Sequence, residues 1–166
     1  SYPTVSWEKP VETINTNVNG TVNVFEAVKR LRKRDGVYDP MVVVACSSAE
    51  YGASLTPENT PVNEDTPLLP LHPYGVSKVG QDLLSFQYWM NDKIRCIRVR
   101  IFNTTGSRKT NDVTSDFVQR AFNIANGAEN IFKVGNLETR RAITDVRDLV
   151  SALVLLSERG NAGDVY

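Results

Sequence analysis

The sequence predicts an α/β fold: a partial Rossmann-like sheet, doubly wound and mainly parallel. Segments with helical spacing alternate with strand-like segments along the chain. The run MVVVAC at 41–46 is continuously apolar, which is typical of a strand covered on both faces. With 166 residues, the chain is long enough for one domain with a hydrophobic core, so we expect a single domain over 1–166.

The first long element is expected to be a helix from Pro10 to Arg34. Its apolar residues recur every three or four positions, which places them along one face of a helix. Proline suits the first helical turn, and Asp35-Gly36 follows as a stop signal. Basic residues crowd 29–34, where a solvated helix end is favoured over a nucleic-acid patch.

Beyond the strand at 41–46, the pattern continues to alternate. Residues 52–73 contain five prolines and indicate a long irregular segment, and segments of this length usually carry a function. We expect helices over 74–91, 115–126 and 146–158, and strands over 94–103 and 131–135.

Composition narrows the classes of function. Nineteen basic residues balance nineteen acidic ones, so no global field favours nucleic acid or an anionic membrane. Cys46 and Cys96 lie in apolar runs and are expected to be buried free thiols. Together with the single histidine they make no convincing zinc site, so no metal is expected. The sequence shows no signal peptide and no bilayer-spanning run, which favours a cytoplasmic protein without a membrane partner.

The stretch HPYGVSK at 72–78 places Tyr74 and Lys78 four residues apart. On a helix these positions share one face, with their β-carbons about 5–6 Å apart. A phenol titrates near ~10, and a nearby cation lowers that pKa, so the pair is suited to proton transfer at a hydroxyl or carbonyl oxygen. The alternative is a surface lysine beside a capping aromatic residue.

Two serines, Ser47 and Ser48, follow directly after the apolar strand at 41–46. The carboxyl ends of parallel strands are where ligands bind in open α/β sheets. A serine at this place could hydrogen-bond the same substrate oxygen as Tyr74. The alternative is a turn with local side-chain to backbone hydrogen bonds.

The order of these motifs resembles the extended short-chain dehydrogenase/reductase family. CSSAEYG at 46–52, a proline-rich loop, PYGVSK at 73–78 and RVRIFN at 98–103 follow one another as in its nucleotide-sugar branch of epimerases, dehydratases and reductases. KVGNLE at 133–138 and TDVRD at 144–148 resemble its GDP-mannose group. The resemblance implies NADP (or NAD) as cofactor and a nucleotide sugar, a GDP-hexose, as substrate.

The resemblance also implies roles for individual residues. Ser47 lies four residues before the family's YG tyrosine and matches the catalytic serine or threonine. Tyr74 matches the catalytic tyrosine, and Lys78 matches the catalytic lysine that also holds the nicotinamide ribose. Both are implied to contact the cofactor. Further implied contacts are Asn17 at the cofactor cleft, with a satisfied interior amide as an equal alternative, Asn103 at the pyrophosphate, Arg141 at the nucleotide phosphates, and Ser48 at the substrate.

One position separates two activities within the branch. Its dehydratases carry a carboxylate two residues after the catalytic serine or threonine, where this sequence has Ala49. Glu50 is displaced by one residue, and continued strand geometry would point it to the opposite face. The sequence therefore favours NADP-dependent 4-keto reduction of a GDP-6-deoxyhexose over GDP-mannose 4,6-dehydration. A shifted turn that brings Glu50 inward would reopen the dehydratase alternative.

The sequence contains no glycine-rich dinucleotide loop, which the family places at its first strand. We therefore expect the chain to match a middle segment, about half of a family member, without the N-terminal glycine-rich half. The strand at 41–46 would then expose an apolar edge, which favours association into a homo-oligomer. The open outcomes are a fragment stabilised by dimerisation, a second polypeptide that supplies the other half, and a rebuilt fold. A catalytically inert binding module is the alternative of another class.

Overall fold

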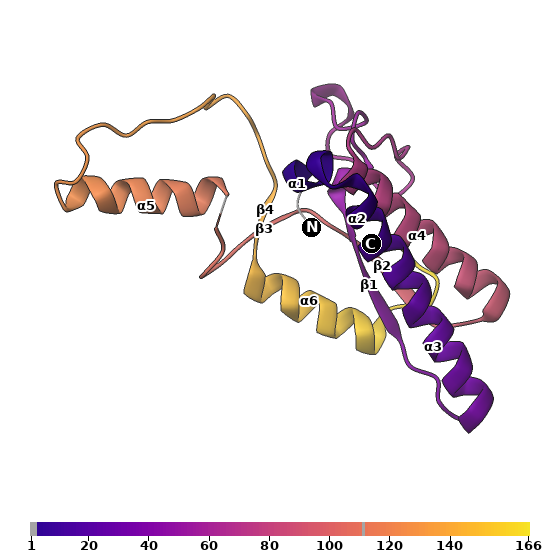
Figure 1. The fold of residues 1–166 in the computed structure, drawn as a ribbon. Helices are drawn as coiled ribbons and strands as arrows, with labels where there is room; N and C mark the ends of the chain where they lie inside the picture. Colours follow the sequence, from indigo (N-terminus) through magenta and orange to yellow (C-terminus); the bar gives the residue numbers. More distant parts are fainter. Residues whose placement is uncertain (1–2, 111) are drawn as a thin grey trace. The chain divides into compact units, whose positions relative to one another are not determined.

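The computed structural model describes residues 3–110 and 112–166, which form two compact units. The first unit comprises residues 3–101 and Leu153–Tyr166, and the second comprises Phe102–Ala152 (Figure 1). Helix α6 (Val146–Arg159) contributes residues to both units. The first unit also contains α1 (Pro3–Glu8), α2 (Pro10–Ile14), the π-helical turn η1 (Asn15–Asn19), α3 (Gly20–Asp35), β1 (Val42–Ser47), the 3₁₀ turns η2 (Ser48–Glu50) and η3 (Pro57–Asn59), α4 (Pro73–Asp92) and β2 (Cys96–Ile101). The second unit contains β3 (Asn103–Thr105), α5 (Val113–Ala125) and β4 (Ile143–Asp145).

The first unit is built on parallel strands. Strands β1 and β2 pair in parallel, from Val42 opposite Cys96 to Ser47 opposite Ile101. On the other side of β2, the Arg98 N–H donates to the carbonyl of Asp164 at 3.1 Å, and Arg98 bridges Val165 in parallel. The predicted α/β fold with parallel strands is therefore confirmed.

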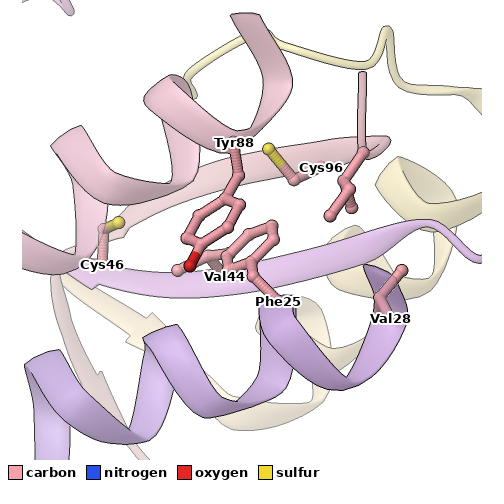
Figure 2. Packing of buried hydrophobic residues seen from close by; sticks show 7 residues of the cluster. Phe25, Val28, Val44, Cys46, Tyr88 and Cys96 are labelled. Atoms are coloured by element: carbon pink, nitrogen blue, oxygen red, sulfur yellow. The ribbon is translucent and has the colours of Figure 1, made fainter. Parts of the chain in front are cut away.

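A hydrophobic core lies between this sheet and helices α3 and α4. The rings of Phe25 on α3 and Tyr88 on α4 stack with centroids 4.7 Å apart and planes within 5° (Figure 2). Cys46 and Cys96 are buried in the same core as free thiols, as the sequence predicted. The buried members of this core are Phe25, Val28, Val44, Cys46, Tyr88, Ile94 and Cys96.

The helix predicted over 10–34 is present but contains a π-helical turn. Pro10 starts α2 at the expected first-turn position, η1 widens the helix for five residues, and α3 continues to Asp35. Gly36 ends α3 with φ +40°, a left-handed conformation that favours glycine. The basic side chains of the last turn lie at the negative end of the helix dipole, in agreement with the sequence interpretation.

The prediction of a strand over 131–135 is wrong. These residues have no regular structure, and Ile131 and Val134 are exposed. The strand of this region is instead β4, which pairs in parallel with β3. A β-prone run becomes a strand only where a neighbouring strand and a buried face are available, and 131–135 has neither in the described part of the chain.

The outer edge of β1 carries a hollow of about 280 Å³. Its lining includes Val42–Ala45 of the strand, Val24 and Phe25 of α3, and Lys78 of α4. The Val42 N–H donates toward β2, to Arg95, so the backbone groups of Val43 and Ala45 point away from β2 toward this edge. Among the described residues no strand pairs with this edge of β1, in agreement with the apolar edge expected from the sequence. Among the helices of the described residues, none is both long and apolar enough to span a membrane.

Candidate active site

The end of β1 is fixed by a capping box around Ser47. The Ser47 hydroxyl accepts the N–H of Ala49 at 3.2 Å, and the Ser47 N–H donates to Oε1 of Glu50 at 2.8 Å. These reciprocal bonds turn the chain into η2 immediately after the strand. Strand geometry ends at Ser47, so the condition under which Glu50 would point to the opposite strand face is not met, and Glu50 turns into the interior with 0% exposure.

The start of α4 packs closely on the same turn. His72 is the N-cap, and its Nδ1 accepts the Gly75 N–H at 2.9 Å. A β-carbon on Gly75 would lie 2.7 Å from the Ala49 carbonyl oxygen and 2.9 Å from Cβ of Pro70. Glycine at position 75 is therefore needed for the helix to approach η2, and this approach brings Tyr74 to Ser47.

The structure brings Ser47, Tyr74 and Lys78 together. The Ser47 side chain lies close enough to the Tyr74 hydroxyl to lower its pKa as a hydrogen-bonding group. The Lys78 Nζ lies 5.7 Å from the centroid of the Tyr74 ring and donates to the carbonyl of Ala45 at 2.7 Å. Their catalytic roles stay predictions, but a hydroxyl, a phenol and an ammonium group meet at the carboxyl end of β1.

Burial is the largest influence on the pKa values of Tyr74 and Lys78. Burial raises the pKa of Tyr74, the bond from Ser47 opposes this, and the charge of Glu50 adds to the increase. Burial lowers the pKa of Lys78. The expectation of a lowered pKa for Tyr74 is therefore wrong, because desolvation of the phenolate outweighs the other influences. Tyr74 is held in its protonated form at neutral pH.

Asn17 lies in the π-helical turn η1 and contacts α4. Its Nδ2 donates to Oγ of Ser77 at 2.8 Å, and that hydroxyl donates to the Tyr74 carbonyl at 2.7 Å. The interior-amide alternative for Asn17 therefore has structural support, while its role at a cofactor stays a prediction. Ser48 lies half-buried in η2, next to Ser47.

The other two predicted residues lie in the second unit. Asn103 is exposed at the start of β3, opposite Ile143 of β4. Arg141 is exposed two residues before β4, and its Nη1 donates to the Arg140 carbonyl at 2.7 Å. The strand register thus places both at the same end of the β3–β4 pair. Their substrate contacts stay predictions.

A buried charge network behind the site was not predicted from the sequence. The Asp82 carboxylate accepts from Arg98 Nη1 at 2.8 Å and from Arg100 Nε at 2.9 Å. Arg100 Nε also lies 3.5 Å from Oε2 of Glu50. A signal was available, since Tyr74, Lys78 and Asp82 repeat every four residues on α4, and two arginines alternate on β2.

Arg100 also holds the long irregular segment. Its Nη1 donates to the carbonyl of Glu64 at 2.7 Å and to the hydroxyl of Tyr51 at 3.2 Å. The segment over 52–73 is therefore attached to β2 through the same side chain that neutralises Asp82. One guanidinium group links the interior network to the loop expected to meet a substrate.

Cys46, Glu50 and Asp82 have ligand atoms within 4.8 Å of one another, close enough to suggest a metal site. Arg98 and Arg100 already supply positive charge to the two carboxylates. Burial also raises the pKa of the Cys46 thiol, which opposes the thiolate form that binds metals. We assign no metal to this cluster.

The fold and this site together define a class of protein. A parallel strand that ends in a serine, beside a helix that carries a tyrosine and a lysine one turn apart, is the arrangement of a Rossmann-type short-chain dehydrogenase/reductase. A family model described as GDP-mannose 4,6 dehydratase matches residues 1–166. The chain belongs to this family, within the nucleotide-sugar branch of the extended short-chain dehydrogenases/reductases.

Curated relatives span the neighbouring activities of this branch. The chain is 27% identical to a GDP-6-deoxy-D-mannose reductase of Pseudomonas aeruginosa, over 100% of this chain and 53% of that protein. It is 26% identical to a GDP-mannose 4,6-dehydratase of Sinorhizobium fredii, over 99% of this chain and 45% of that protein. The chain therefore spans about half the length of these relatives.

Solved structures agree with the fold. The structure of RMD from Pseudomonas aeruginosa complexed with NADPH matches 100% of this chain and 56% of that one, with a TM-score of 0.87 and 29% identity. A dTDP-glucose 4,6-dehydratase from Bacillus anthracis in complex with NAD matches 92% of this chain and 46% of that one, with a TM-score of 0.74 and 27% identity.

Proposed function

We propose that this chain carries the proton-transfer site of a nucleotide-sugar oxidoreductase that reduces the 4-keto group of a GDP-6-deoxyhexose with NADPH. The observation that carries the proposal is the convergence of Ser47, Tyr74 and Lys78 at the carboxyl end of β1. The similarity to a GDP-6-deoxy-D-mannose reductase, and to a structure complexed with NADPH, supports this substrate and cofactor.

The site fits the reductive direction. The hydroxyl groups of Ser47 and Tyr74 would both donate to the 4-keto oxygen, and Tyr74 would transfer its proton to that oxygen as the carbon is reduced to a secondary alcohol. Tyr74 carries its proton at neutral pH, because burial holds its pKa above the ordinary value of 10.0, so the phenol is present as a proton donor and not as a base. Ala49 offers no carboxylate for the elimination of water, which also favours reduction.

The residues present fit one part of the cofactor. The Lys78 ammonium would hold the hydroxyl groups of the nicotinamide ribose, in exchange for its bond to the Ala45 carbonyl. NADPH supplies the hydride when bound. The hollow beside Lys78, about 280 Å³, lies just below the usual volume of a ligand site, so it would enclose only part of a dinucleotide.

Tyr74→Phe tests the proposal. The variant keeps the ring and removes the proton donor, so the rate of NADPH oxidation with a GDP-4-keto-6-deoxyhexose should fall by roughly 10²-fold or more. Tyr38→Phe is the matched control, because Tyr38 is 41% exposed and lies before β1, away from the site. Retention of most activity by Tyr74→Phe would refute the assignment.

A second candidate is GDP-mannose 4,6-dehydration. One observation favours it: Glu50 has turned inward, and burial raises its pKa to about 7, a value suited to acid-base work. The family description and the Sinorhizobium fredii relative agree with this activity. Product analysis after incubation with GDP-mannose separates the candidates, since a dehydratase yields a 4-keto-6-deoxy sugar and a 4-keto reductase leaves GDP-mannose unchanged.

A catalytically inert binding module is the remaining alternative, because the sequence lacks a glycine-rich loop. Calorimetric titration of the chain with NADPH addresses it. Measurable binding that Lys78→Met weakens would support the enzyme proposal. Absence of binding would favour the inert alternative.

A further inference from the structure

Glu50 has an unusual position for a carboxylate. It is 0% exposed, and its Oε1 accepts the backbone N–H of Ser47 at 2.8 Å. Its Oε2 lies 3.5 Å from Nε of Arg100, an ion-pair contact longer than a hydrogen bond. The carboxylate therefore lies between the strand end that presents Ser47 and the guanidinium group that anchors the long loop.

We propose that Glu50 is a positioning residue: by accepting the Ser47 N–H, it fixes the Ser47 backbone and thereby aims the Ser47 hydroxyl at Tyr74. The inference rests on the proposed function for its catalytic consequence, since the value of aiming Ser47 depends on a substrate oxygen being bound there. It goes beyond that function by giving the buried carboxylate a role other than acid-base chemistry.

Geometry favours positioning over direct catalysis. A catalytic acid or base must reach a proton on the substrate, whereas the oxygen atoms of Glu50 are enclosed by protein. Oε1 is already engaged by the Ser47 N–H, and Oε2 faces Arg100. Release of Glu50 toward a substrate would leave the Ser47 N–H and part of the Arg100 charge without a partner, which is costly in the interior.

The groups around Glu50 come from three neighbouring elements. Arg100 approaches from β2, Asp82 from α4 and Cys46 from β1. Glu50 in turn acts electrostatically on Tyr74 and Lys78: burial raises the pKa of Tyr74 and Glu50 adds to the increase, while burial lowers the pKa of Lys78 and Glu50 partly offsets the decrease. Burial raises the pKa of Glu50 itself to about 7 despite the opposing bond from Ser47, and Asp82 adds to the increase. The bond to Ser47 therefore changes from a charged to a neutral acceptor as the pH falls through about 7.

The test is a pH titration of the Ser47 backbone amide by NMR, with ¹⁵N-labelled chain and three variants. Glu50→Ala removes the acceptor, Glu50→Gln keeps a neutral acceptor of the same size, and Glu158→Gln, an exposed position on α6, is the control. In the wild type and in the control, the chemical shift of the Ser47 amide proton should change with pH, with a midpoint near pH 7. In Glu50→Gln this pH dependence of the chemical shift should disappear. In Glu50→Ala the Ser47 amide resonance should shift upfield by more than the resonances of the other amides of β1.

Turnover adds a second readout. Glu50→Ala should lower kcat about tenfold while leaving KM nearly unchanged, because the Ser47 hydroxyl is no longer held in its orientation while the rest of the site is unchanged. Glu50→Gln should restore most of kcat, which an acid-base role for Glu50 would not allow. A Ser47 amide that is insensitive to both Glu50 variants overturns the inference, as does a Glu50→Gln enzyme as slow as Glu50→Ala.

The two readouts separate this inference from the proposed function. If the wild-type chain shows no reductase activity while Ser47 responds to Glu50 as expected, the proposed function fails and the positioning contact stands. If activity is present and Ser47 does not respond, the positioning role fails and the proposed function stands.

Discussion

The two compact units hold their site residues in different ways. In the first unit, Tyr74 and Ser47 are fixed by a helix cap, a capping box and a buried ion network. This unit also contains the packed hydrophobic core. In the second unit, α5 has no buried residue, and Val118 and Phe122 are 66% and 62% exposed. The comparison teaches that proton-transfer geometry is defined by the first unit's own packing, while Asn103 and Arg141 lie where internal constraints are few.

The sharpest way to break this comparison is to remove one aromatic ring from each unit. Phe25→Ala should lower the free energy of unfolding of the first unit by about 4 kcal/mol, because Phe25 is 0% exposed and stacks on Tyr88. Phe122→Ala, the matched control on α5, should change stability by less than about 0.5 kcal/mol. Urea unfolding measures both, and equal effects would contradict the contrast between the units.

The buried ion network should give the next largest effect. Asp82→Asn keeps the size of the side chain but leaves two buried arginines short of negative charge, at a cost of about 3 kcal/mol or more. Asp116→Asn, at the exposed start of α5, should cost less than about 1 kcal/mol. Because Arg100 also binds the Glu64 carbonyl, Asp82→Asn should increase proteolysis within 52–73. An Asp82→Asn protein as stable as the wild type would show that the network is dispensable.

Much of the first unit could be predicted from the sequence because its signals are local. Helical spacing from Pro10, the uninterrupted apolar run at 41–46 and the PYGVSK start of α4 correspond to elements within one or two residues of the expected bounds. Strand β4 and the irregular 131–135 segment were misjudged for one reason. Pairing with β3 decides which short segment becomes a strand, and pairing is not encoded locally.

The candidate site was predictable only in part. The four-residue spacing of Tyr74 and Lys78 placed them on one face, and the end of β1 supplied Ser47. The inward turn of Glu50 depends on the capping box at Ser47, a feature that a strand-period interpretation overlooks. The raised pKa of Tyr74 depends on burial by neighbouring elements, which no short motif reveals.

A smaller effect is expected at the contact between α4 and η2. Gly75→Ala places a methyl group 2.7 Å from the Ala49 carbonyl oxygen, so the helix start must move, at a cost of about 1–3 kcal/mol. The loss of kcat should be larger than the loss of folded protein explains, because Tyr74 moves away from Ser47. Gly20→Ala has no atom within 4 Å of the new β-carbon and should be neutral or stabilising by up to about 1 kcal/mol. Similar turnover in the two variants would contradict the role given to Gly75.

The most direct test of the central claim is the pKa of Tyr74, followed by NMR of ¹³C-labelled tyrosine and assigned with Tyr74→Phe. The convergence of Ser47 and Tyr74 in a buried setting requires a pKa above the ordinary value of 10.0. Ser47→Ala should raise it further, because the bond from Ser47 lowers it in the wild type. A Tyr74 pKa at or below 10.0 that Ser47→Ala leaves unchanged would show that the two side chains do not meet, and would contradict the account.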